Sequence, residues 1–269
     1  MCIRDRRRSL QREGTPTSPV STDVVLCGVG GQGVLSIAWI IDEAAVTAGY
    51  QLKQPEVHGM AQRGGAVSAF VRIADTPIAS DLIGAGEAHA IVAVEPLEAL
   101  RYVHLLRPDG WIVTDVTPFV NVGNYPATDA LYDVLFATPR LIALDATRLA
   151  HEAGTVKAQN MVVLGAAAAL LPIPAALLER FIDAQFAAKG PRIVAANVAA
   201  FRMGAAAGAF TTDLVQRGVP AVRRARLRQA RTAPSARRGR TATARRRPRR
   251  QRAAGPPSAR CRRQRPCPA

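Results

Sequence analysis

The chain has few cysteines, and their spacing forms no recognisable motif. Cys2 and Cys27 stand alone and Cys261 and Cys267 lie near the end, so no C-x-x-C pair exists. Zinc sites and iron–sulfur clusters draw several closely spaced cysteines from one chain, so this chain alone can build neither. Only Cys27 lies in the part of the sequence able to bury a core, which excludes a disulfide within that part. This usage suits a reducing compartment.

Long apolar runs are also missing. A bilayer span needs roughly 18 or more apolar residues, and the nearest candidate, MVVLGAAAALL at 161–171, is too short. The opening MCIRDRRRSLQREG has arginines but no apolar segment after them, so it lacks the form of a secretory signal. We therefore expect no membrane partner and a cytoplasmic location.

Acidic residues are nearly absent from the C-terminal part of the chain. Residues 211–269 hold 19 Arg and a single acid, Asp213, whereas 23–210 hold 12 Lys and Arg against 17 Asp and Glu. The net charge of +16 therefore belongs to the two ends, and the middle is mildly acidic. We expect a disordered, non-native extension at 1–22, a folded domain at 23–208, and a disordered Arg/Ala/Pro-rich tail at 209–269.

Beyond disorder, the composition of the tail has two competing explanations. Arginines bind nucleic acid by releasing counterions from its phosphates, but no aromatic residues are interleaved with them to stack on bases, so a nucleic-acid partner is disfavoured. Arg, Ala, Pro and Gly have GC-rich codons, and a GC-rich gene translated out of frame gives such a sequence. We favour this frameshift hypothesis and regard MCIRDR as a sequencing remnant. An in-frame basic tail in the genomic DNA would contradict it.

The middle of the chain alternates between strand and helix patterns. Short apolar or alternating runs predict strands at 23–27, 66–74, 88–94, 111–115 and 140–146. Helical spacing and start signals predict helices at 34–48, 96–106, 127–137, 147–153, 158–171, 174–188 and 191–207. No strand is predicted between 49 and 65. Alternating strands and helices predict an α/β fold of three layers, α/β/α, with a Rossmann-like, largely parallel sheet and a helical C-terminal part.

A glycine-rich turn, GVGGQG at 28–33, follows the first strand and opens the first helix. Its glycines Gly28, Gly30 and Gly33 fit G-x-G-x-x-G, in which missing side chains let the backbone approach a phosphate at the helix N-terminus. A dinucleotide site also needs an acid about 20 residues on, at the end of a second strand. Only Glu56 is near that spacing, and no strand is predicted before it, so an NAD-binding dehydrogenase is disfavoured and kept only as the alternative. In a third interpretation the glycines only allow tight contact between helix and sheet.

Three segments together carry a family resemblance. The turn VGGQGVL, the loop EVHGMAQRGG at 56–65 and the later NMVVLGAAAALLP resemble the gamma-type domain of 2-oxoacid:ferredoxin oxidoreductases, over about 23–208. Within that family the sequence is most similar to the beta subunits of indolepyruvate ferredoxin oxidoreductases.

The resemblance implies the activity and its division between chains. A larger partner chain would carry thiamine diphosphate with Mg and the iron–sulfur clusters. The 2-oxo acid would be decarboxylated on the thiazolium, electrons would pass through the clusters to ferredoxin, and the acyl group would go to coenzyme A. This chain would hold none of the redox cofactors and no metal, would complete the complex, and would be inactive alone.

The loop EVHGMAQRGG supplies the candidate site residues. We expect His58, Gln62 and Arg63 to face the partner and help shape its pocket, because Arg63 can pair with a carboxylate or phosphate and His58 can exchange a proton near neutral pH. The competing interpretation is a surface loop in which Glu56 pairs with Arg63. Gly28, Gly30, Gly31 and Gly33 are the candidate contacts for a phosphate or for coenzyme A.

The remaining polar residues have simpler expected roles. Cys27 ends a buried strand and is expected to be a core residue rather than a nucleophile. Asp115 is the last residue of WIVTD and is expected to cap a turn or helix. Lys157 and Asn160 precede an apolar helix, and the sequence leaves open whether they serve its start or face a partner.

Overall fold

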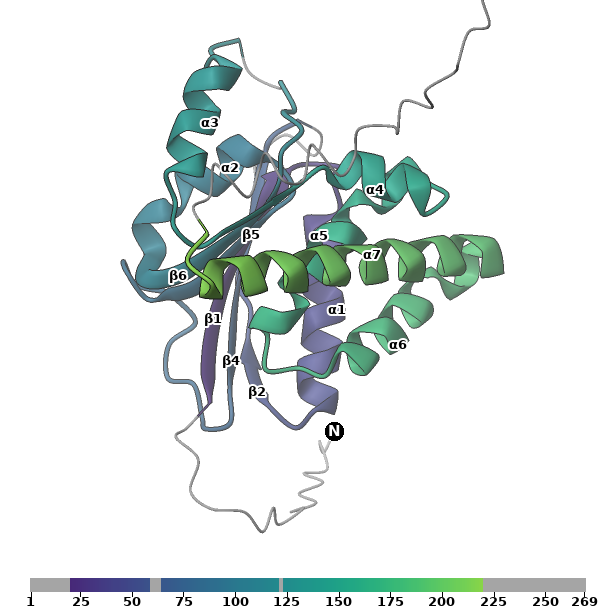
Figure 1. Ribbon diagram of the computed structural model, residues 1–269. Helices are drawn as coiled ribbons and strands as arrows, with labels where there is room; N and C mark the ends of the chain where they lie inside the picture. Colours follow the sequence, from purple (N-terminus) through teal and green to yellow (C-terminus); the bar gives the residue numbers. More distant parts are fainter. Residues whose placement is uncertain (1–19, 59–63, 121–122, 220–269) are drawn as a thin grey trace, which may run out of the picture. The chain divides into compact units, whose positions relative to one another are not determined.

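The computed structural model describes residues 20–58, 64–120 and 123–219 (Figure 1). Gln62 and Arg63, the chain before residue 20 and the tail from residue 220 lie outside these ranges. Within them, a mixed sheet of seven strands has the order β2-β4-β1-β5-β6-β7, with β3 also paired to β4.

The centre of the sheet is parallel and buried on both faces. Its strands are β1 (Ser21–Val29), β5 (Ala88–Ala93), β6 (Leu106–Asp115) and β7 (Leu141–Leu144). Burial on both faces explains why their sequences are nearly continuously apolar, and it confirms the predicted parallel strands. β1 begins at Ser21, before the expected start of the folded domain at residue 23.

The strand β4 (Ala66–Ala74) pairs antiparallel with β1 and lies next to the edge of the sheet. Beyond it lie two short strands, β2 (Gln51–Lys53) and β3 (Glu56–His58). The expectation of no strand between 49 and 65 was therefore wrong. Each strand has only three residues, too few for period-two alternation to appear in the sequence.

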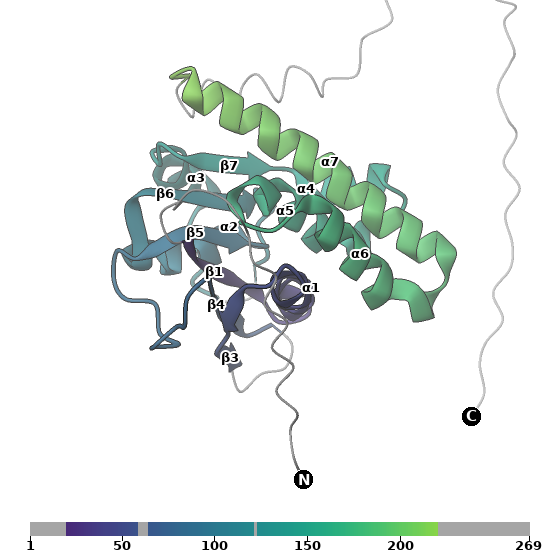
Figure 2. The same ribbon diagram turned by 90° about the horizontal axis from the view of Figure 1, so that it is seen from below.

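Helices cover both faces of the sheet and make the three predicted layers (Figures 1 and 2). One face packs against α1 (Val34–Thr47), α4 (Ala146–Glu152), α5 (Gln159–Ala167), α6 (Ala175–Phe186) and α7 (Pro191–Gln216). The other packs against α2 (Pro96–Arg101) and α3 (Thr128–Phe136). Single 3-10 turns lie at Val103–Leu105, Val156–Ala158, Ala168–Leu170 and Ala187–Lys189.

The helices α5 and α7 cross in backbone contact. A Cβ added to Gly204 of α7 would lie 1.9 Å from the carbonyl oxygen of Val162, and one added to Gly165 of α5 would lie 2.0 Å from that of Phe201. Only glycine fits such a crossing, so these residues fix how closely the C-terminal helices approach each other.

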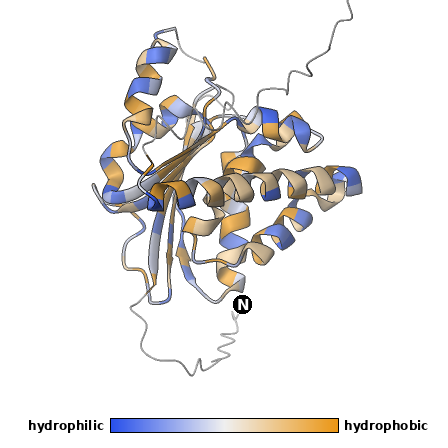
Figure 3. Cartoon of the chain, viewed as in Figure 1, coloured by the Kyte–Doolittle hydropathy of each residue, from blue (hydrophilic) through white to orange (hydrophobic). Residues whose placement is uncertain are grey.

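The helix α7 is longer than predicted. It runs to Gln216 rather than to 207, so residues 209–216 are helical and do not belong to a disordered tail. Figure 3 shows it coloured mostly as apolar along its length. By length and composition alone it could cross a membrane, but helices in the cores of soluble proteins pass the same test. The expectation that no apolar segment is long enough to span a bilayer therefore does not hold for α7.

The strand β6 includes Pro-Asp-Gly at 108–110, which lies before the strand predicted at 111–115. Ala88 of β5 pairs with Leu106, whereas Ala90 pairs with Trp111, so the register shifts over this stretch. The Pro-Asp-Gly sequence therefore makes an irregularity inside a strand rather than a turn before one.

Candidate functional site

The glycine turn lies where β1 ends and α1 begins, at the carboxyl edge of the parallel strands. Gly31 has φ of 100° and Gly33 has φ of 81°, both in the left-handed region. A Cβ on Gly28 would lie 2.9 Å from a methyl group of Val34. The glycines at these positions are thus needed for backbone shape or for close contact with the helix.

The side chain of Gln32 stabilises the turn by a hydrogen bond within it. Its Oε1 accepts a hydrogen bond of 2.8 Å from the backbone N–H of Val29. The backbone N–H of Gln32 also donates to the carbonyl of Val29. The turn is therefore held in one shape by its own residues.

The loop at 56–65 meets this turn directly. The N–H of Gly30 donates to the carbonyl of Gly65 over 2.8 Å, and the N–H of Gly64 donates to the carbonyl of Gly30 over 3.4 Å. At its other end the loop begins in β3, where His58 pairs with Val67 of β4. The structure thus brings Gly64 and Gly65, at the end of the loop, to the glycine turn, whereas Gln62 and Arg63 lie outside the described residues.

The N-terminus of α1 is open for an anion. Gly33 occupies the N-cap without a side-chain cap, and the first turn of the helix holds no acidic residue. Gly31 is exposed, and a Cβ built there would meet no heavy atom within 4 Å. Uncapped N–H groups and the positive end of the helix dipole favour negative charge at such a place.

The third family segment, which begins at Asn160, also reaches this turn. Nδ2 of Asn160 donates a hydrogen bond of 3.2 Å to the carbonyl of Gly33, and a Cβ added to Gly33 would lie 2.4 Å from that nitrogen. Asn160 is 5% exposed, and its Oδ1 has no hydrogen-bond partner among the described residues. The sequence left its role open because no local pattern reports a contact between residues so far apart.

The end of β5 supplies a buried acid that the sequence analysis missed. Glu95 is 1% exposed and caps α2 by accepting from the N–H of Glu98. Its other oxygen accepts from the hydroxyl of Tyr125 and from the N–H of Phe119 at 3.4 Å. Burial and the bond to Glu95 raise the pKa of Tyr125. Glu95 therefore ties the segment after β6 to the same edge of the sheet.

Asp115, at the end of β6, has the capping role predicted for it. Its Oδ1 accepts from the N–H of Ala146, in the first turn of α4, and from the N–H of Thr117, both over 3.1 Å. Burial raises the pKa of Asp115 to about 6, although these hydrogen bonds oppose the shift. The carboxyl group holds two chain segments together.

Cys27 is a core residue, as predicted. It is fully buried in β1, and burial, with the nearby carboxylates of Glu98 and Glu95, raises the pKa of its thiol. A thiol kept protonated in this way is a poor nucleophile. Lys157, which the sequence placed beside Asn160, is exposed in the 3-10 turn before α5 and does not join the site.

The strand order argues against a dinucleotide site. In that fold the ribose is bound by an acid at the end of a parallel strand next to β1. Here that neighbour is the antiparallel β4, and Glu56 starts β3 at the far side of it. The acid expected from sequence spacing is thus on a different strand with a different direction.

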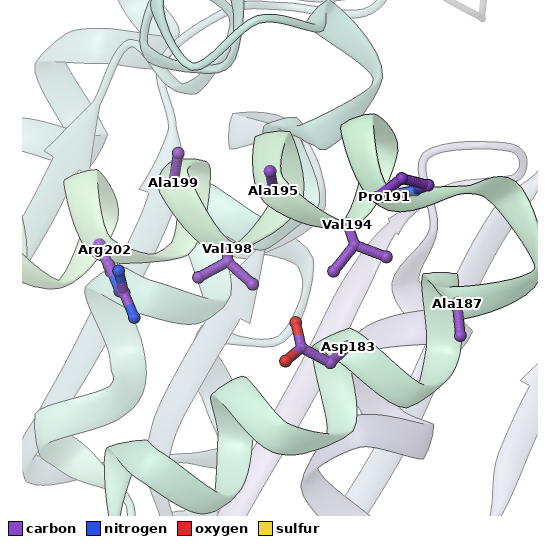
Figure 4. A pocket seen from close by; sticks show the side chains of 8 residues that line it. All are labelled: Asp183, Ala187, Pro191, Val194, Ala195, Val198, Ala199 and Arg202. Atoms are coloured by element: carbon purple, nitrogen blue, oxygen red, sulfur yellow. The ribbon is translucent and has the colours of Figure 1, made fainter.

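A broad groove elsewhere on the molecule contains none of the predicted site residues. It runs between α6 and α7 and is lined mainly by alanine, valine and proline side chains, together with Asp183 and Arg202 (Figure 4). The candidate site is therefore the carboxyl edge at the N-terminus of α1, where the three family segments meet.

Comparisons with known proteins agree with the fold. Residues 23–207 match the family model of pyruvate ferredoxin/flavodoxin oxidoreductases. The chain belongs to this family.

The relatives of this chain include small subunits of such enzymes. The indolepyruvate oxidoreductase subunit IorB of Archaeoglobus fulgidus is 38% identical over 189 residues, which are 68% of this chain and 92% of the relative. The Pyrococcus abyssi common subunit gamma of pyruvate/ketoisovalerate oxidoreductases is 31% identical, over 52% of this chain and 73% of that one.

Among solved structures, the gamma subunit of a keto/oxoacid ferredoxin oxidoreductase from Geobacter sulfurreducens matches with a TM-score of 0.51 and 25% identity, over 70% of this chain and 99% of that one. A 2-oxoglutarate:ferredoxin oxidoreductase from Magnetococcus marinus shares the fold with a TM-score of 0.57 and 20% identity. The match covers 71% of this chain and 31% of that longer chain.

Proposed function

We propose that this chain is the small subunit of an oxidoreductase that oxidises indolepyruvate or another aryl pyruvate and passes the electrons to ferredoxin. Membership of a 2-oxoacid:ferredoxin oxidoreductase complex follows from the family. The single observation that supports the aryl substrate is the 38% identity to an indolepyruvate oxidoreductase subunit over 92% of its length.

The redox cofactors belong, in this proposal, to a larger partner chain that carries thiamine diphosphate, Mg and iron–sulfur clusters. The described residues do not fit a cluster, because their one cysteine, Cys27, is wholly buried within a strand. Nor do they include a group of three His, Cys, Asp or Glu side chains placed to hold a metal ion. The chain is then inactive without its partner.

The contribution of this chain is a place for the phosphates of coenzyme A. The glycine turn offers backbone N–H groups and the positive end of α1 with no side chain in the way. Gly28, Gly30, Gly31 and Gly33 are the proposed contacts. The exposed tip at Gly31 and the uncapped N-cap at Gly33 support this assignment.

The loop that follows β3 is proposed to face the partner beside this place. Backbone bonds from Gly30 to Gly64 and Gly65 put the end of the loop next to the turn. His58, Gln62 and Arg63 would then help to shape the substrate or coenzyme A pocket. Arg63 is the residue suited to a phosphate or carboxylate.

The proposal is tested by purifying the complex from cells that express a tagged form of this chain. A co-purifying larger brown protein, and ferredoxin reduction that needs both indolepyruvate and coenzyme A, are expected. The rate with indolepyruvate should exceed the rates with pyruvate, 2-ketoisovalerate and 2-oxoglutarate. A complex that prefers an aliphatic 2-oxo acid would contradict the aryl assignment, and NAD reduction in place of ferredoxin reduction would contradict the activity.

A further inference from the structure

Asn160 is buried, but only half of its amide group is satisfied. It is 5% exposed, with Nδ2 bonded to the carbonyl of Gly33 over 3.2 Å. Its Oδ1 has no partner among the residues that the structure describes. A leucine has nearly the same size and would avoid an unsatisfied acceptor, so the amide carries a free-energy cost that packing alone does not explain.

The side chain does not serve its own helix. α5 has Ala158 at its N-cap and no side-chain cap bond. Asn160 instead reaches across to α1, where Gly33 is the N-cap. The two residues are fitted to each other, because any side chain on Gly33 would collide with the amide of Asn160.

An uncapped helix N-terminus and a buried, unpaired polar group thus lie side by side. No side chain caps the first turn of α1, and that turn holds no acidic residue to neutralise its partial positive charge. Oδ1 of Asn160, next to that turn, has no donor within residues 20–58, 64–120 and 123–219. A ligand bound at the turn, or a water held with it, would supply the missing hydrogen bond while its phosphates meet the N–H groups of the helix.

We propose that Asn160 is a positioning residue that sets the first turn of α1 for the phosphates of coenzyme A. This inference rests on the proposed function, because it names a residue for the same site. Nδ2 holds the carbonyl of Gly33 and thereby aims the N–H groups that follow it. Asn160 acts through Gly33, and it takes no part in the chemistry of the 2-oxo acid.

The test compares Asn160→Leu and Asn160→Asp in the purified complex with a matched control. Asn197 of α7 is 3% exposed, and its Nδ2 donates to the carbonyl of Ile193 over 2.8 Å. Asn197→Leu therefore removes a similar buried amide that has no contact with the turn. The KM for coenzyme A, the KM for the 2-oxo acid and kcat are measured for each variant.

Loss of binding that is equal in the ground and transition states raises KM without changing kcat. We expect Asn160→Leu to raise the KM for coenzyme A about tenfold, with the other two constants within about twofold of wild type. Asn160→Asp should raise it further, because its negative charge lies close to the phosphates, and added salt should reduce the difference. Asn197→Leu should leave all three constants nearly unchanged. Equal effects of Asn160→Leu and Asn197→Leu, or a change confined to kcat, would overturn the proposal.

Calorimetric titration of the full-length chain with coenzyme A separates this inference from the proposed function. Weaker binding by Asn160→Leu than by Asn197→Leu supports the role of Asn160 even where the complex proves to act on another 2-oxo acid. Equal binding by the two variants contradicts the role of Asn160 while leaving the activity of the complex untouched.

Discussion

The backbone N–H of Gly30 donates a hydrogen bond of 2.8 Å to the carbonyl of Gly65. This bond joins two segments that are separate in the sequence, the glycine turn and the end of the loop that begins at Glu56. Gly64, beside it, has φ of 80°, a conformation that costs other L-residues about 1–2 kcal/mol. Gly64, Gly65 and the glycine turn therefore form one hydrogen-bonded unit at the carboxyl edge of the sheet.

Substituting Gly64 tests whether this unit takes part in the activity. Gly64→Ala should lower the free energy of unfolding by about 1 kcal/mol and raise the KM for coenzyme A. Gly218→Ala is the control, since Gly218 also has positive φ, at 72°, with open space around it, but follows α7. It should cost similar stability and leave the kinetics alone. Urea unfolding and steady-state kinetics of the two variants decide this, and identical kinetics would separate the loop from the site.

The contact between Gly33 and Asn160 predicts non-additive stability effects. Gly33→Ala should lower the free energy of unfolding by about 2–3 kcal/mol, from its left-handed φ and from the collision with Nδ2 of Asn160. In an Asn160→Ala background the collision is absent, so the same change should cost about 1 kcal/mol less. A double-mutant cycle by urea unfolding measures the difference, and additive effects would show that the two side chains do not compete for this space.

The crossing of α5 and α7 predicts a large effect of one added methyl group. Gly204→Ala would place Cβ within 1.9 Å of the backbone oxygen of Val162, so the helices must separate. We expect a loss of about 3 kcal/mol or more, toward the upper end for overpacking. Ala206→Leu, on the exposed side of the same helix, should change stability by less than about 0.5 kcal/mol. Thermal unfolding of both variants tests this, and a mild effect of Gly204→Ala would refute the close crossing.

The raised pKa of Asp42 in α1 should make the stability of the protein depend on pH. Burial, aided by the charges of Glu56 and Glu43, raises its pKa to about 7, and its Oδ1 is buried without a partner among the described residues. In the unfolded chain the carboxyl group ionises near 3.8, the ordinary pKa of an aspartate. The folded state therefore binds the proton more tightly, and the wild type loses stability as pH rises from about 4 to about 7.

Asp42→Asn removes this loss. The variant should be more stable than wild type by about 1–2 kcal/mol at pH 8, a value discounted for the partial exposure of the group. The gain should shrink as pH falls and disappear near pH 4. Glu43→Gln, at an exposed neighbouring position, should show a much smaller trend in the same direction, because it removes only one of the charges that add to the effect of burial. Denaturant unfolding across this pH range provides the measurement, and a gain that does not vary with pH would exclude a raised pKa as its cause.

The sequence predicted the layers and the parallel strands because buried strands are recognisable by their apolar runs. The strands β2 and β3 were not predicted, because three-residue strands of mixed polarity carry no periodicity and exist only through pairing with β4. The predicted helix ended at 207, short of the observed end of α7 at Gln216, because small residues continue there without a clear periodic pattern.

Within the site, the glycine turn and the loop were both identified, and family resemblance suggested their roles. Their contact depends on backbone bonds between distant residues, which no local pattern reports. The same holds for Asn160, whose partner is Gly33. Glu95 was missed because a capping acid buried at a strand end has the same sequence context as one on the surface.

The most direct test of the central claim is a titration of this chain into its purified larger partner, with indolepyruvate, coenzyme A and oxidised ferredoxin present. We expect no ferredoxin reduction by either chain alone, and a rate that rises with added chain and saturates at a fixed ratio. Full activity of the partner by itself, or a rate that this chain does not change, would contradict the account.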